Sequence, residues 1–234
     1  MEKIELNADF DKRVSVHGAK QEWQSSPMKG VDRRLLERIG DEVARATSIV
    51  RYAPGSKFSS HVHTGGEEFL VLDGVFQDEH GDFPKGSYIR NPPNSEHTPR
   101  SDDGCTILVK LWQFEATDRK HVKVDANALV GEDIDGRDGV SVMPLYSDDR
   151  EVVRMEKWAA NCDIDLVVDG GLEVFVVEGG FEEGGELFSE QSWLRLPVGS
   201  QLKARASSDG ALVWVKEGHL AKLDREAFAT GASN

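Results

Sequence analysis

The sequence predicts an all-β protein with two similar units. Among its 234 residues are 23 glycines, which separate short runs of valine, isoleucine, leucine, phenylalanine and tryptophan. This pattern is typical of β-barrels and β-sandwiches. Helical periodicity is scarce, and only residues 32–38 and 224–229 are expected as short helices. Two tandem β-barrels are therefore the expected fold.

Each half of the chain contributes five expected strands. In the first half they are residues 46–52, 58–63, 67–76, 87–90 and 105–114. In the second half they are residues 152–158, 163–168, 172–181, 192–196 and 211–216. The two sets look like two copies of one unit, which indicates an internal repeat.

The repeat has a displacement of 105 residues, the difference between Gly74 in DGVF and Gly179 in EGGF. The same displacement places Pro92 on Pro197. A polar stretch rich in Asp and Gly separates the copies and is suitable for a linker. The expected parts are an N-terminal arm (1–30), a first barrel (31–116), a linker (117–138), a second barrel (139–220) and a C-terminal tail (221–234).

Metal-capable side chains gather in the first unit. The segment GSKFSSHVHTGGEEFLVLDG, residues 55–74, contains His61, His63 and Glu67, and His97 follows a proline-rich turn. Side chains two residues apart on a strand point to the same face, so both imidazoles of the first pair can enter one cavity. A glycine-containing turn can bring Glu67 back beside them. Three imidazoles and one carboxylate form a ligand set for a divalent cation.

Glu67 is expected to be the carboxylate ligand, because the side chain of Glu68 should point to the opposite face of the strand. Cys105 begins a core strand and is expected to be a buried small hydrophobe, although a redox role for it stays open. No catalytic residue is assigned. The other histidines are expected at the surface, namely His17, His80, His121 and His219.

The second unit has lost these ligands. At a displacement of 105 residues every ligand position is aliphatic, and the four residues are Leu166, Val168, Leu172 and Leu202. Filling the cavity with hydrocarbon replaces metal coordination by apolar burial. The second barrel is therefore expected to be structural.

The composition limits which binding partners and which cellular compartment are expected for this protein. A net charge of −14 opposes binding to nucleic acid or to anionic membranes. Two cysteines are too few for a secreted disulfide framework. No apolar run has the character of a signal peptide or the length of a membrane span. We expect a soluble cytoplasmic protein, and a homodimer because edge strands need covering.

These motifs resemble those of the cupins, small conical β-barrels in which two motifs hold a metal. The first cupin motif, with its HxH pair, carboxylate and flanking glycines, is matched by Gly55, His61, His63, Glu67 and Gly74. The second motif keeps its spacing at Gly86, Pro92 and His97. Asn94 stands where the family usually has Gly and Ser101 where it often has Asn, but Asn tolerates the left-handed turn conformation.

More narrowly, residues 44–105 resemble the cupin part of ChrR-type anti-sigma factors. In that family the cupin binds zinc and takes part in the response to singlet oxygen or organic hydroperoxides, by controlling release of a sigma factor. The family's ligands correspond to His61, His63, Glu67 and His97. Its separate sigma-binding zinc domain carries an HxxxCxxC run, which does not occur in this sequence.

Three functional hypotheses follow from the resemblance and the site. The first is a metal-binding bicupin resembling the ChrR sensor, which acts in oxidative-stress regulation with a regulatory protein partner or a small-molecule ligand. The second is a metal-dependent dioxygenase-type enzyme acting on a small carbonyl compound. The third is a dimer that the metal only braces. One divalent metal per chain is expected, with zinc as the first choice and iron, manganese or nickel as alternatives.

Overall fold

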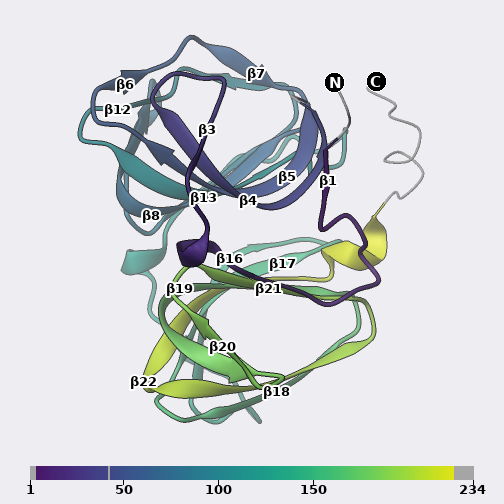
Figure 1. Cartoon of the computed structure of the whole chain (residues 1–234). Helices are drawn as coiled ribbons and strands as arrows, with labels where there is room; N and C mark the ends of the chain where they lie inside the picture. Colours follow the sequence, from purple (N-terminus) through teal and green to yellow (C-terminus); the bar gives the residue numbers. More distant parts are fainter. Residues whose placement is uncertain (1–3, 42, 224–234) are drawn as a thin grey trace. The chain divides into compact units, whose positions relative to one another are not determined.

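A computed structural model describes residues 4–41 and 43–223 of the chain. The chain forms two compact antiparallel β units, and Figure 1 shows their strands. Unit 1 contains the residues up to Ala8 together with Gln21–Ala128, and unit 2 contains Asp9–Lys20 together with the residues from Leu129 onward. The expectation of an all-β protein is confirmed.

Unit 1 is built on an antiparallel sheet with the strand order β1-β4-β5-β13-β8-β10-β14, and β7 pairs with β11 in a separate two-stranded ribbon. β3, β6, β9 and β12 extend the main sheet as short branches. The elements are β1 (Glu5–Leu6), β3 (Gln24–Ser25), β4 (Val31–Gly40), β5 (Ala44–Tyr52), β6 (Ser56–Lys57), β7 (His61–His63), β8 (Glu67–Asp78), β9 (Gly81–Pro84), β10 (Ser87–Asn91), β11 (Ser95–His97), β12 (Arg100–Ser101), β13 (Cys105–Leu111), β14 (Val122–Asp125) and the 3₁₀ turn η2 (Ala126–Ala128).

Unit 2 repeats the central part of this arrangement. Its strand order is β15-β16-β17-β22-β19-β21-β2, with β18 and β20 as branches. The elements are β2 (Val14–His17), η1 (Gly18–Lys20), β15 (Glu132–Asp133), β16 (Val140–Ser147), β17 (Val152–Trp158), β18 (Asp163–Val168), β19 (Leu172–Glu183), β20 (Glu186–Ser189), β21 (Ser192–Leu196), β22 (Ser200–Glu217) and η3 (His219–Lys222). The strands β5-β13-β8-β10 of unit 1 thus correspond to β17-β22-β19-β21.

The register of the repeat is confirmed by strand pairing and by backbone conformation. His61 pairs with His97 in unit 1, and Leu166 pairs with Leu202 in unit 2, at the displacement of 105 residues that the sequence predicts. Gly74 and its counterpart Gly179 have φ angles of +69° and +72°. A Cβ atom at either position would meet a backbone carbonyl oxygen at 2.1 or 2.2 Å, so only glycine fits.

The predicted helix at residues 32–38 is wrong, because this stretch lies within strand β4 and pairs with β5. A β-bulge between Leu35 and Glu37 inserts Leu36 as an extra residue, which interrupts the alternation of the strand. The apolar spacing that results resembles a helical period, and pairing to β5 decides the conformation instead. The other predicted helix, at residues 224–229, lies outside the described residues.

The stretches expected as an arm and a linker contribute strands. In the arm, β1 pairs with β4 and β2 pairs with β21. Within residues 117–138, expected as a solvent-exposed linker, β14 pairs with β10 and β15 pairs with β16. Most of these strands lie at sheet edges, where a strand needs few apolar residues. Their polar composition therefore lacks the apolar pattern from which strands are predicted.

Each unit has its own apolar core. In unit 2, the interior cluster includes the predicted aliphatic residues Val168, Leu172 and Leu202, all at most 1% exposed, with Leu166 packed against them. In unit 1 the corresponding cluster is rich in phenylalanine and includes Phe69 and Phe76. None of the helices in the described part of the chain is long and apolar enough to cross a membrane.

Unit 2 also buries a charged group. Glu156, 1% exposed, accepts hydrogen bonds from Arg137 at 2.6 and 2.8 Å, from Arg154 at 2.7 Å and from the indole N–H of Trp158 at 2.7 Å. Burial acts to raise the pKa of Glu156, but these hydrogen bonds and the two guanidinium charges outweigh it and hold the pKa below its ordinary value of 4.5.

Replacing this carboxylate, as Glu156→Gln, is expected to lower the free energy of unfolding by about 2 kcal/mol at pH 7. Because the folded-state pKa is depressed, the stabilisation is present above the ordinary carboxyl pKa and is lost as the pH falls toward the folded value. The difference between the variant and the wild type should therefore shrink in acid. Urea unfolding monitored by tryptophan fluorescence at several pH values measures it.

The matched control is Glu132→Gln, on the exposed strand β15. This substitution should change the free energy of unfolding by no more than about 0.5 kcal/mol. Equal stability of Glu156→Gln and the wild type at pH 7 would contradict the stabilising role of the buried carboxylate.

Candidate metal centre

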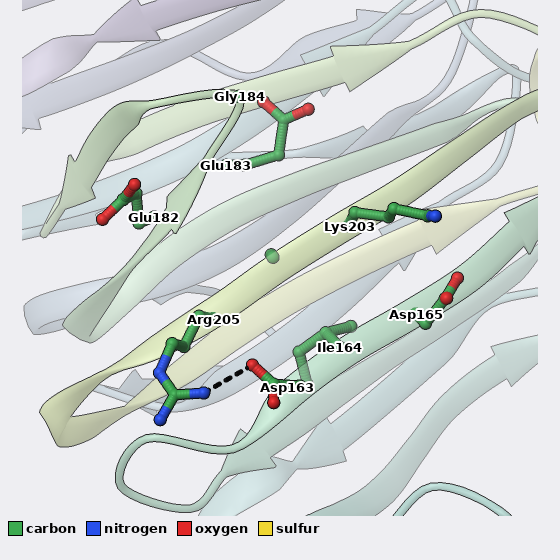
Figure 2. Close-up of a pocket in the computed structure, with 9 residues that line it drawn as sticks. Asp163, Ile164, Asp165, Glu182, Glu183, Gly184, Lys203 and Arg205 are labelled. Carbon is green, nitrogen blue, oxygen red and sulfur yellow. Dashed lines mark hydrogen bonds and ion pairs between the residues drawn. The ribbon is translucent and has the colours of Figure 1, made fainter.

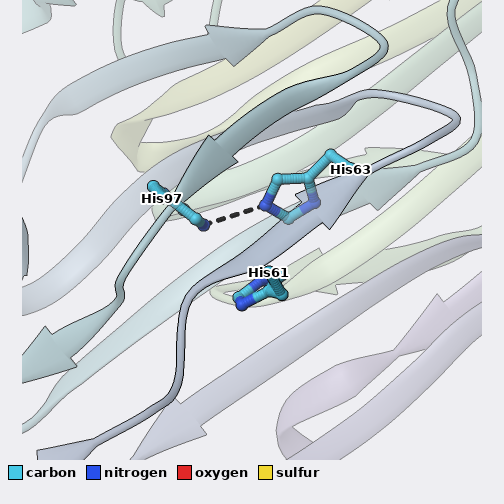
Figure 3. A group of neighbouring side chains, drawn as sticks. All are labelled: His61, His63 and His97. Atoms are coloured by element: carbon cyan, nitrogen blue, oxygen red, sulfur yellow. Dashed lines mark hydrogen bonds between the residues drawn. The ribbon is translucent and has the colours of Figure 1, made fainter.

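Three histidines converge in unit 1 from two short strands. His61 and His63 lie on β7, and His97 lies on the antiparallel partner β11 (Figure 3). One ring nitrogen from each residue lies within 4.8 Å of those of the other two. The Nε2 atoms of His63 and His97 are 2.8 Å apart. The alternation of a strand predicts that the two histidines of the HxH pair share a face. Both rings indeed lie beside the ring of His97.

The carboxylate of Glu67 lies beside two of these rings. Its Oε2 is 3.5 Å from Nε2 of His63 and 3.7 Å from Nε2 of His97. The side-chain amide of Asn91 donates a hydrogen bond of 3.3 Å to the same oxygen. All four predicted residues are thus neighbours, although the tight group of ligand-capable atoms consists of the three histidines.

Glu68, the competing carboxylate, occupies the opposite face of β8. Its Oε1 accepts a 2.5 Å hydrogen bond from the hydroxyl of Tyr88, and its Oε2 lies 3.7 Å from Arg90. This residue is 1% exposed. Strand alternation therefore distinguishes the two adjacent glutamates as expected.

Two of the histidines have their remaining ring nitrogen occupied. Nδ1 of His97 is 3.2 Å from the buried Oδ2 of Asp78, and Nδ1 of His61 is 3.2 Å from the carbonyl oxygen of Ser59. Both oxygens accept a hydrogen bond, so in each neutral ring Nδ1 carries the proton and Nε2 is left bare. In most metal-ligating histidines, one ring nitrogen donates a hydrogen bond to an oxygen acceptor while the other, unprotonated nitrogen binds the metal. The donor set therefore fits a divalent cation.

The surroundings shift the pKa values of the groups in the cluster in different directions. Burial lowers the pKa of His63. Burial also acts to lower the pKa of His97, but its hydrogen bond to Asp78 and the negative charges of Glu67, Asp78 and Glu79 outweigh it and raise that pKa. The pKa of Asp78 is lowered, because hydrogen bonds from His97 and from the backbone N–H of His80 outweigh its burial. Carboxylates so close to three imidazoles favour a cation among them.

Aromatic rings line the side of the cluster next to His97. The Phe76 ring lies 5.8 Å from the His97 ring, measured between centroids. Tyr52 contacts Phe76 edge-on at 5.7 Å and Phe58 edge-on at 5.4 Å. The sequence favours a core role for the aromatic residues of these strands, and Phe76, 1% exposed, has one.

Two residues beside the cluster were missed by sequence reasoning, namely Asp78 and Asn91. Asp78 lies at the end of β8, and Asn91 lies at the end of β10 and pairs with Glu67. The pairing of β10 with β8 could have indicated Asn91, because residues opposite each other on neighbouring strands share a face.

The remaining histidines divide between surface and interior. His80 and His121 are exposed, as predicted. His17 is half-buried, and its Nε2 is 2.9 Å from Glu186. The surface prediction for His219 is wrong, because this residue is 4% exposed and its Nε2 is 2.7 Å from the buried carboxylate of Glu173.

Cys105 is buried, as predicted, with 4% of its surface exposed. Burial raises the pKa of its thiol to about 11. Since the thiolate is the reactive form, this environment makes Cys105 a poor nucleophile near neutral pH.

Unit 2 contains a surface pocket of about 380 Å³, which Figure 2 shows. Four carboxylates and two cations line it, and Arg205 forms a 2.7 Å ion pair with Asp163 across two strands. Its lining includes neither histidine nor cysteine. The metal-capable histidine cluster and this charged pocket therefore belong to different units.

The comparisons with known proteins give the class of protein, which is one with the cupin fold and a candidate three-histidine metal site. Residues 11–115 match the family described as the ChrR Cupin-like domain. Most of the matched stretch, residues 21–115, lies in unit 1 and includes the histidine cluster. No curated protein matches it significantly.

Solved structures share the fold over most of the chain. A candidate dioxygenase from Nostoc punctiforme has a TM-score of 0.72 at 16% identity, covering 92% of this chain and 85% of its own. A cupin 2 conserved barrel domain protein from Leptotrichia buccalis has a TM-score of 0.59 at 11% identity, with 92% and 100% covered. A bacterial pirin from Escherichia coli in complex with nickel(II) has a TM-score of 0.62 at 13% identity, with 88% and 99% covered. At these identities the likeness concerns the fold.

Proposed function

We propose that this protein is a metal-binding bicupin in which His61, His63, Glu67 and His97 hold one divalent cation. The observation that carries the proposal is the convergence of three imidazoles within 4.8 Å, with a carboxylate 3.5 Å from one of them. When bound, the cation would supply a Lewis-acidic centre, and a redox centre if it were iron or manganese. The nickel complex of the Escherichia coli pirin supports a divalent ion in this fold.

The site is confined to one unit of the two. In unit 2 the four ligand positions are aliphatic and belong to the apolar core or pack against it. The buried carboxylate of Glu156 is fully hydrogen-bonded within unit 2, by Arg137, Arg154 and Trp158. Unit 2 therefore offers neither ligands nor an unsatisfied polar group at these positions, which supports a structural role for it.

We further propose that the metal-bound protein acts as a regulatory sensor of oxidative stress, with zinc as its metal. The support is the match of residues 11–115 to the ChrR Cupin-like domain. The buried Cys105, with its raised pKa, is not suited to oxidant sensing, so the proposed response depends on the metal centre.

Metal analysis of the full chain, purified without added ions, tests the site. We expect one divalent ion per chain by inductively coupled plasma mass spectrometry. Exposure of the zinc form to tert-butyl hydroperoxide is then expected to change its metal content or its midpoint of thermal unfolding. A chain that binds no metal even after incubation with zinc would overturn the site. An oxidant-insensitive zinc form would overturn only the sensing role.

The alternative function is a dioxygenase-type enzyme acting on a small carbonyl compound. It is favoured by the fold similarity to the Nostoc punctiforme protein described as a candidate dioxygenase. Oxygen uptake by the iron-loaded protein, on addition of a β-dicarbonyl compound, would place this function ahead of the sensor. Zinc held with no exchangeable ligand would exclude it.

A further inference from the structure

The ribbon of β7 and β11 carries a further polar side chain on the face that holds the histidines. Ser95 begins β11 and is paired directly opposite His63 of β7. Opposed residues of an antiparallel pair share a face, with Cβ atoms about 4.5–5.5 Å apart. Ser95 also shares a face with His97, two residues further along the same strand. Val62 and Glu96, on the other face, are exposed. Ser95 therefore lies beside a proposed metal ligand, on the ligand face of the ribbon.

The hydroxyl oxygen of Ser95 is buried and has no hydrogen-bond partner among the residues that the structure describes. Two other serines near the ribbon have partners. The Ser60 hydroxyl donates to Glu96 at 2.6 Å, and the Ser101 hydroxyl donates to the carbonyl oxygen of Val75 at 2.7 Å. A buried hydroxyl without a partner is unfavourable, and a bound water, ion or ligand commonly accounts for one. The Ser95 hydroxyl is thus a polar atom on the ligand face that is available to a bound molecule.

Unit 2 separates the role of this position in the turn from the role of its side chain. Ser200 is the counterpart of Ser95 at the displacement of 105 residues, and it is paired opposite Val168. In each unit the backbone N–H of the serine donates to the carbonyl oxygen of a proline three residues earlier, at 3.0 Å in unit 1 and 3.3 Å in unit 2. The turn therefore uses the backbone and does not account for the hydroxyl. In unit 1 this hydroxyl lies beside an imidazole, whereas in unit 2 it lies opposite a core aliphatic residue.

We propose that the Ser95 hydroxyl donates a hydrogen bond to a small anion that binds at the metal centre. The inference rests on the proposed metal site. An anion is the fitting ligand, because one Glu carboxylate leaves a divalent centre with excess positive charge. A serine hydroxyl is neutral and carries one donor, so it can bind an anionic oxygen or nitrogen without changing the charge of the site. Ser95 then holds the ligand of the metal and is not itself a metal ligand.

Azide is a suitable probe, because it binds metals and accepts hydrogen bonds. The full chain is loaded with cobalt(II), and azide binding is followed through the visible absorption bands of cobalt. Ser95→Ala removes only the hydroxyl. It should bind cobalt at the wild-type stoichiometry but bind azide about tenfold more weakly, as expected for one lost hydrogen bond to an anion. The infrared stretch of bound azide should also shift, since it responds to hydrogen bonding of the azide itself. Ser95→Thr, which keeps a hydroxyl, should restore most of the azide affinity.

Ser200→Ala is the matched control, since it removes the serine hydroxyl at the equivalent position of unit 2 and should leave azide affinity unchanged. Equal azide affinity in Ser95→Ala and the wild type, or a wild-type protein that binds cobalt but no azide, would overturn the role of Ser95 while leaving the metal site intact. Loss of cobalt from folded Ser95→Ala would make Ser95 a metal ligand and would also overturn the proposed role. A wild-type chain that binds no cobalt would overturn the metal site, and with it this inference.

Discussion

Replacing His97 with alanine is expected to abolish stoichiometric metal binding, whereas the wild-type chain should hold one divalent ion. His97 is 2% exposed, and its Nε2 lies 2.8 Å from His63 and 3.7 Å from Glu67. Its removal takes away one of the three clustered imidazoles and the ligand contributed by β11, so the four-ligand set falls to three and its affinity should drop below what survives gel filtration. The measurement is metal content after incubation with zinc and gel filtration. His61→Ala should give the same loss.

The substitution also leaves a cavity, so folding must be checked in parallel. His97→Gln keeps most of the side-chain volume and should lose the metal as well, with the far-ultraviolet circular dichroism of the wild type. His121→Ala removes an exposed histidine outside the site and should retain full occupancy. Full occupancy in folded His97→Ala or His97→Gln would refute the ligand assignment.

The position of the histidine cluster could be predicted because it depends on local rules. Side chains two apart share a face, which brings His61 and His63 together without any knowledge of the fold. The return of His97 required one long-range pairing, which the resemblance to the cupins supplied. The internal repeat then gave an independent check, since Leu166 and Leu202 pair in unit 2 as His61 and His97 do in unit 1.

Asp78 could not be predicted, because a β-bulge interrupts strand β8. On the neighbouring strand β13, Thr106 pairs with Asp73 and Ile107 pairs with Val71. Leu72 of β8 is therefore an extra residue without a partner in the register. Before the bulge the interior-facing positions are odd-numbered, as at Glu67 and Phe69, and after it they are even-numbered. Alternation counted from Glu67 would therefore place Asp78 on the wrong face. Nothing in the local sequence marks where the extra residue falls.

His219 could not be placed for a different reason. It lies in the short turn η3, which has no hydrophobic period, and its partner Glu173 is 46 residues away. A buried hydrogen bond between a histidine and a carboxylate is specified by tertiary packing, which also determines the exposure of Glu173. The prediction of a surface residue followed from average behaviour and failed because a specific acceptor exists.

Asp78→Asn is expected to weaken metal binding by about tenfold to a hundredfold while leaving the stoichiometry at saturation unchanged. The carboxylate of Asp78 accepts a 3.2 Å hydrogen bond from the Nδ1–H of His97, and Asp78 is itself 8% exposed. It therefore fixes the tautomer that presents Nε2 to the metal, and its charge raises the basicity of the ring. Asparagine can still accept the hydrogen bond through its amide oxygen but lacks the charge, so the site survives with lower affinity.

Competition with a chelator of known zinc affinity gives the dissociation constants of the wild type and the variant. Asp103→Asn removes an exposed carboxylate from the same unit and controls for the change in net charge. An unchanged affinity in Asp78→Asn would mean that His97 is oriented by its packing against Phe76 alone. Complete loss of metal at saturation would instead make Asp78 a ligand. Only the intermediate result, weaker binding at full stoichiometry, agrees with a carboxylate that acts on the metal through His97.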